Sequence, residues 1–191
     1  MSNQQGGRIR EYVAAGQCHH ADIRSTPSHP ARLDSLAAQS LPDWELLIID
    51  DGSRGATGAA ACFRRSAHPL RAPASKPGPG PCAQRLPGTR TRPLLAYLPQ
   101  DGVFFNDHLR DLADCLAASP AAVLAFSGMR HWQAPGCMLQ LVQCMHRCTP
   151  LRWRTRAETV SDDLEDLFWE RLRYGGAFEY SGAVSCERDG Q

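Results

Sequence analysis

Two neighbouring aspartates, Asp50 and Asp51, follow directly on a short aliphatic run and precede a Gly-Ser pair typical of a turn. The run covers residues 46–49 and contains no polar residue, which predicts a strand buried on both faces of a parallel sheet. In open α/β sheets, ligands bind at the carboxyl ends of such strands. We therefore expect both carboxylates to project into a binding site at that edge.

Three more acids stand at the ends of predicted elements. Asp101 follows a second apolar segment, LLAYL at 94–98, and precedes Gly102, a pair that also suits an ordinary turn. Asp162 and Asp163 precede the apolar-periodic segment 164–172. We expect Ser161 to cap a helix there, with both aspartates in its first turn, where they would also stabilise the helix dipole. Gly175-Gly176 would end this helix.

Cysteine and histidine side chains gather between residues 131 and 148. Zinc accepts both ligand types, although structural zinc sites usually arrange them as two spaced pairs. The alternative is a helix over residues 138–145 that passes under the core, with the cysteines as small apolar side chains. The residues of this cluster are His131, Cys137, Cys144, His146 and Cys148.

The elements that would position these groups alternate between helix and strand. Helices are predicted from Pro30 to about Ser40 and, with Asn106 as N-cap, to about Ala118; strands are predicted at 46–49, 94–98 and 122–126. This alternation predicts an α/β fold. Residues 1–29 supply at most a two- or three-residue strand. Residues 54–93, acid-free and rich in arginine and proline, predict either a solvated loop or one that helps to hold a phosphate.

Taken in order, three of these segments resemble the inverting GT-A glycosyltransferases of family 2. They are WELLIIDDGS at 44–53, DGVFFNDHL at 101–109 and SDDLEDLFWERLRYGG at 161–176. The resemblance implies a GT-A-like (Rossmann-like), mostly parallel sheet flanked by helices over residues 30–191. Residues 1–29 would then be a poorly defined segment, and an acceptor-binding part would be incomplete at the C-terminus.

The same resemblance implies roles for four aspartates. Asp50 and Asp51 would contact the nucleotide-sugar donor, with Asp51 at the nucleoside. Asp101 would bind Mg²⁺ or Mn²⁺ at the donor diphosphate, and Asp163 would be the general base that deprotonates the acceptor hydroxyl. The acceptor, whether glycan, lipid-linked sugar or protein, stays unspecified. Two alternatives stay open: a non-catalytic remnant of such an enzyme, because the family's donor-site motifs are depleted here, and a small zinc-stabilised interaction module.

The composition of the chain bears on its domain count, its binding partners and its location in the cell. With 191 residues, 42% of them apolar, the chain can form one hydrophobic core. The charged residues make up 21% and the net charge is +1, so the sequence lacks the excess of basic residues typical of nucleic-acid binding. No apolar run approaches the length of about 20 residues that a membrane helix needs. We expect a cytoplasmic protein, with peripheral attachment at the inner face of the membrane as an option, and reduced thiols at its eight cysteines.

Overall fold

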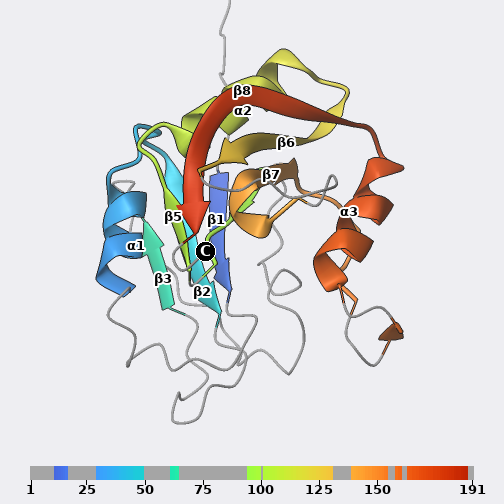
Figure 1. Ribbon diagram of the computed structural model, residues 1–191, viewed down its shortest axis with the longest axis horizontal. Coiled ribbons are helices and arrows are strands. Elements are labelled where there is room, and N and C mark those ends of the chain that lie inside the picture. Colours follow the sequence, from blue (N-terminus) through green and yellow to red (C-terminus); the bar gives the residue numbers. More distant parts are fainter. Residues whose placement is uncertain are drawn as a thin grey trace, which may run out of the picture.

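The structure is a computed structural model that describes residues 11–16, 29–49, 61–64, 94–99, 101–130, 139–154, 158–160 and 163–188. In this part of the chain one eight-stranded sheet has the order β3-β2-β1-β4-β7-β6-β8-β5 (Figure 1). Its strands are β1 Glu11–Gly16, β2 Trp44–Ile49, β3 Ala61–Arg64, β4 Leu94–Tyr97, β5 Gly102–Phe104, β6 Ala122–Met129, β7 Cys144–Arg147 and β8 Ala177–Arg188. The helices are α1 His29–Ala37, α2 His108–Ala118 and α3 Leu164–Arg173, with a 3₁₀-helix at Leu141–Gln143.

The sheet is mixed rather than mostly parallel. β1 pairs in parallel with β2 and β4, and β6 pairs in parallel with β8. The pairings β2–β3, β4–β7, β6–β7 and β5–β8 are antiparallel. The prediction of a mostly parallel sheet is therefore wrong. β3, β5 and β7 have only three or four residues each, too few for a period of two to stand out in the sequence.

Strand β1 lies near the centre of the sheet, with β2 on one side and β4 on the other. Its six residues, EYVAAG, exceed the two- or three-residue remnant expected within residues 1–29. Tyr12 and Val13 favour a strand, but the glutamate, the two alanines and the glycine around them do not, so the local pattern predicts only a short strand. Pairing with a neighbour along both edges is what makes it a strand.

The carboxyl ends of β1, β2 and β4 lie at the same edge of the sheet. In the parallel registers Gly16 stands beside Ile49, and Ala14 stands beside Tyr97. The strands predicted at 46–49 and 94–98 are thus confirmed, and they end where ligand-binding groups of α/β folds are found. Asp50 and Asp51 come directly after β2 but lie outside the described residues.

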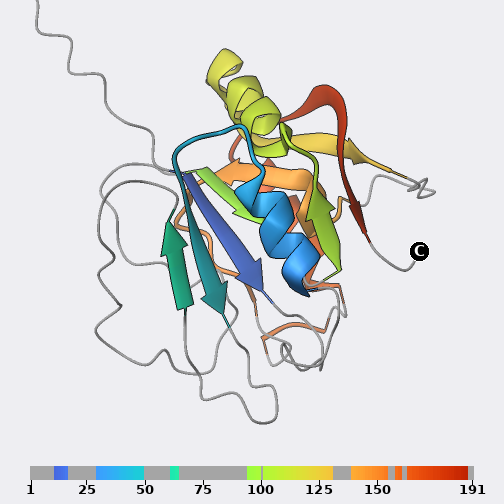
Figure 2. The ribbon, with the colours of Figure 1, turned by 90° about the vertical axis from the view of Figure 1, so that its left-hand side faces the viewer.

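Helices cover both faces of the sheet (Figures 1 and 2). Successive residues of a strand point to opposite faces, and β4 shows this: Leu94 and Ala96 join the core under α1 and α2, whereas Tyr97 joins the core under α3. The first core includes Leu36 of α1 with Leu109, Leu112 and Leu116 of α2. The second includes Phe168, Trp169 and Leu172 of α3. None of the helices described is long and apolar enough to cross a membrane.

The first two predicted helices are confirmed, with one difference in capping. The N-cap of α2 is Asp107 rather than Asn106, and its side chain makes no capping hydrogen bond. It instead accepts a hydrogen bond from the Ser40 hydroxyl at 2.5 Å. Buried Gln39 donates to the Phe105 carbonyl at 2.8 Å and accepts from the Leu109 backbone N–H at 3.0 Å. The Gln39 side chain, which follows α1, therefore caps the first turn of α2 in place of Asp107.

Candidate functional site

Asp101 lies in the turn that joins β4 to β5. The Gly102 backbone N–H closes this turn by donating to the Pro99 carbonyl at 3.0 Å. A Cβ atom on Gly102 would come within 2.9 Å of the Val142 Cγ2 and 3.1 Å of the Pro99 Cδ, so only glycine fits without a shift of its neighbours. The turn holds Asp101 just beyond the carboxyl end of β4, where the sequence predicted a ligand-binding carboxylate.

The carboxylate of Asp101 is paired with Arg188, at the end of β8. Gly102 and Arg188 stand opposite each other in the antiparallel β5–β8 register, which brings the two side chains together. Arg188 donates from Nε to the Asp101 Oδ2 at 2.7 Å, and its Nη2 donates to the same oxygen. Its Nη1 donates to the Gln140 Oε1 at 2.5 Å. One guanidinium thus joins the β4–β5 turn, β8 and the segment before the 3₁₀-helix.

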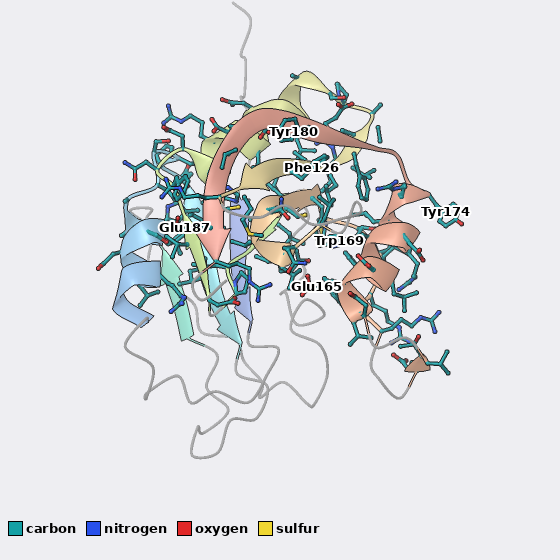
Figure 3. All side chains as sticks on the ribbon, viewed as in Figure 1. Phe126, Glu165, Trp169, Tyr174, Tyr180 and Glu187 are labelled. Atoms are coloured by element: carbon teal, nitrogen blue, oxygen red, sulfur yellow. The ribbon has the colours of Figure 1, made fainter. Side chains whose placement is uncertain are left out.

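Glu165, in the first turn of α3, lies on the other side of that segment. Its Oε2 accepts a hydrogen bond from the Leu141 backbone N–H at 3.2 Å. Burial raises the pKa of Glu165 to about 7; the Leu141 hydrogen bond opposes this, the charge of Asp163 adds to it and the charge of Arg188 opposes it. Figure 3 places Glu165 on the side of α3 toward the strands and Tyr174 on the outer side.

Asp163 is the N-cap of α3. Its carboxylate accepts a hydrogen bond from the Asp166 backbone N–H at 2.9 Å, as capping aspartates do. The helix begins at Leu164, so the prediction of Ser161 as cap and of Asp163 inside the first turn is wrong by two residues. The acids of the first turn are Glu165 and Asp166. The proposed base therefore lies just outside the helix.

We call Asp101, Arg188, Gln140 and Glu165 the Arg188 network. It brings Asp101 close to the start of α3, because the Gln140 side chain bonds Arg188 and the next backbone N–H bonds Glu165. Asp163 adjoins the network through its charge on Glu165. The sequence singled out Asp101 and Asp163 but missed Glu165 and Arg188. An acid one turn into a helix and an arginine at a strand end carry no local pattern that distinguishes them from surface residues.

Packing of α3 fixes the segment that carries Gln140. The Trp169 indole N–H donates to the Leu139 carbonyl at 3.0 Å, which ties this segment to the inner side of α3. On the same side, the Phe168 ring stacks on Trp153 with centroids 4.1 Å apart. These aromatic contacts fix the position of α3 against the sheet. The contact between Leu141 and Glu165 follows from them.

Among the described residues of the cysteine–histidine cluster there is no group of three side chains that could hold an ion, and zinc binding stays one of the two alternatives drawn from the sequence. The helix expected over 138–145 is wrong, since Cys144 to Arg147 is strand β7. Buried His146 has both ring nitrogens engaged: Nε2 lies 2.7 Å from the Tyr97 hydroxyl and Nδ1 lies 2.8 Å from the Arg147 carbonyl. A carbonyl only accepts, so Nδ1 carries the proton and Nε2 accepts from Tyr97. Both His131 and Cys137 fall outside the described residues.

A divalent ion at Asp101 would compete with Arg188. An ion on Oδ2 would stand beside the guanidinium that already donates to this oxygen twice, and the two positive charges would repel each other. As arranged, Asp101 therefore does not fit Mg²⁺ or Mn²⁺. No group of three acidic, cysteine or histidine side chains that could hold an ion occurs among the residues with a described position. The metal site stays a prediction from the sequence, and it requires Arg188 to leave Asp101.

Comparison with known proteins shows an α/β fold of the glycosyltransferase type. One similar solved structure is that of S. aureus TarS, a glycosyltransferase, with a TM-score of 0.62 and 12% sequence identity over 93% of this chain. This chain spans 36% of the length of TarS. No protein-family model and no curated protein match the sequence. At this level of identity the likeness shows the fold alone, and membership of family 2 stays a prediction.

Proposed function

We propose that this protein transfers a sugar from a nucleotide-sugar donor to an acceptor hydroxyl, with inversion at the anomeric carbon. The proposal is carried by one observation: in a glycosyltransferase-like fold, the Arg188 network connects Asp101, after β4, to the acids at the start of α3. The network reaches Glu165 by hydrogen bonds and Asp163 through its charge on Glu165. The family resemblance assigns Asp101 to the donor and Asp163 to the acceptor. Asp50 and Asp51, which follow β2 in the sequence, would contact the donor, with Asp51 at the nucleoside.

The reaction needs a base at the acceptor and a positive charge at the leaving group. The base takes the proton of the acceptor hydroxyl, whose oxygen then forms a bond to the anomeric carbon. The bond between that carbon and the diphosphate breaks on the opposite face. The nucleoside diphosphate leaves with the electron pair, and the configuration inverts.

Two carboxylates are candidates for the base. The family resemblance favours Asp163, whose carboxylate also accepts the capping hydrogen bond from Asp166. The pKa favours Glu165, because a carboxyl group with a pKa of about 7 is partly ionised at neutral pH and binds a proton more strongly than an ordinary carboxylate does. We retain Asp163 as the proposed base and Glu165 as the competing assignment.

A donor screen with three variants tests both assignments. The protein is incubated with UDP-, GDP- and dTDP-sugars and simple sugar acceptors, and nucleoside diphosphate release is measured. Loss of the base should lower the rate by roughly 10² to 10⁴. Asp163→Asn and Glu165→Gln remove one charge each, and Glu170→Gln is the matched control because Glu170 is exposed on the same helix.

The outcomes separate the hypotheses. A large loss in Asp163→Asn alone supports Asp163, and a large loss in Glu165→Gln alone transfers the role to Glu165. If both variants react at the parental rate, neither Asp163 nor Glu165 is the base. Nucleotide binding without turnover by any donor would contradict the proposed activity and favour a non-catalytic remnant.

A further inference from the structure

Arg188 is the only cation that the described structure places among the acids of the site. Its guanidinium bonds Asp101 and Gln140, and its charge acts on Glu165. The side chain is 26% exposed, so a ligand can reach it from solvent. The hydrogen bonds to Asp101 and Gln140 fix the orientation of the guanidinium before any ligand binds.

The guanidinium has donors left for a ligand. Nε, Nη1 and Nη2 each give one hydrogen bond to Asp101 or Gln140, and an arginine carries more N–H groups than these. The described residues bond the side edge of the guanidinium to Asp101. One N–H group remains on Nη1 and one on Nη2, and either can donate a charge-assisted hydrogen bond to a phosphate oxygen while Asp101 holds the guanidinium.

We propose that Arg188, rather than a divalent cation at Asp101, is the positive charge that binds the diphosphate of the donor and stabilises it as it leaves. Asp101 and Gln140 are then positioning residues, which fix the guanidinium at the sheet edge. This inference rests on the proposed sugar transfer for the identity of the donor, but the anion site itself does not depend on that activity. It accounts for a depleted acidic motif, in which Asp101 stands without the neighbouring acids of the resembled family.

Calorimetric titration with UDP and with inorganic pyrophosphate tests the inference, each in Mg²⁺ and in EDTA. The wild-type protein should bind UDP with dissociation constants that agree within about threefold in the two buffers. Arg188→Gln should weaken the binding of both ligands at least about tenfold, because the positive charge and its charge-assisted hydrogen bonds to phosphate are lost. Arg188→Lys should recover part of the affinity, because it keeps the charge without the planar fork.

Arg130→Gln is the matched control. Arg130 is exposed at the end of β6, pairs with Glu187 at 3.0 Å, and carries the same charge as Arg188. Its loss should leave both affinities unchanged. Circular dichroism of each variant shows whether it is folded, and Arg188→Lys carries the test if Arg188→Gln is not.

Failure of this inference and failure of the proposed function give different results. UDP binding that requires Mg²⁺ and does not change in Arg188→Gln overturns the role of Arg188 and leaves sugar transfer standing. Pyrophosphate binding that depends on Arg188, without turnover of any nucleotide-sugar, supports the anion site and contradicts the transfer activity. A wild-type protein that binds neither ligand overturns both.

Discussion

Glu165 should make the stability of this protein fall as the pH rises from about 4.5 to about 7. Burial raises its pKa from 4.5 to about 7. Between these two values the folded protein keeps a proton that the unfolded chain has released, so raising the pH favours unfolding. Each pKa unit is worth about 1.4 kcal/mol, which makes the cost of ionising Glu165 in the folded state about 3 kcal/mol.

Two buried histidines have the opposite effect on stability, over an overlapping range of pH. Burial lowers the pKa of His108 to about 3 and that of His146 to about 4, both from 6.5. The unfolded chain protonates these histidines first, so they destabilise the folded protein as the pH falls below 6.5. The pH profile of the wild-type protein alone therefore does not isolate Glu165. The difference between the wild type and Glu165→Gln does, because the histidines contribute equally to both.

Urea unfolding followed by tryptophan fluorescence, at intervals between pH 5 and pH 8, measures this difference. Glutamine keeps an oxygen that can accept from the Leu141 N–H, so the variant loses the charge and not the hydrogen bond. We expect Glu165→Gln to gain about 2.5 kcal/mol relative to the wild type between pH 5 and pH 8, because part of the effect lies below pH 5. Exposed Glu170→Gln should show no such trend. A difference between wild type and Glu165→Gln that stays constant with pH would refute the burial argument.

Three further predictions concern single contacts, each measured as the free energy of unfolding in urea. Asp163→Ala should cost about 1 kcal/mol through the lost cap of α3, whereas Asp163→Asn should cost little because asparagine caps equally well. Gly102→Ala should cost roughly 1 to 3 kcal/mol, because the new methyl group would overlap Val142. Tyr97→Phe should cost about 1 to 3 kcal/mol by leaving the buried His146 Nε2 without its donor. An unchanged free energy in any of these variants would contradict the contact named for it.

The elements that the sequence predicted are those with a strong local pattern. α2 has leucines at helical spacing, β2 contains the apolar run 46–49 and β4 is apolar throughout, so each was found within a few residues. β1 was underestimated because EYVAAG is extended mainly by its neighbours. β7 was mistaken for a helix because its buried residues lack the alternation of a one-sided strand, being covered on both faces.

The site was predictable to the extent that it follows motifs. Asp101 and Asp163 could be identified because each stands at the boundary of a recognisable element. Arg188 and Glu165 could not, because their roles arise from packing between distant segments. The ion pair of Arg188 depends on the β5–β8 register, and the burial of Glu165 depends on the segment that Trp169 ties to α3. Neither register nor segment packing can be derived from local spacing.

The Asp101–Arg188 pair also bears on the order in which the molecule assembles. Its two residues are 87 positions apart, and the Gln140–Arg188 bond spans 48. Contacts of such long range form after local ones, because the entropy of closing a large loop must be overcome first. β8 runs as an arch from α3 to β5, so the residues that meet Asp101 lie at the far end of the arch from α3 (Figure 1). A folding intermediate with α2 and β6 in place but β8 unpaired would already have a core. In it, Asp101 would be exposed to water without its partner Arg188. Anion recognition would be the last property that this protein acquires as it folds.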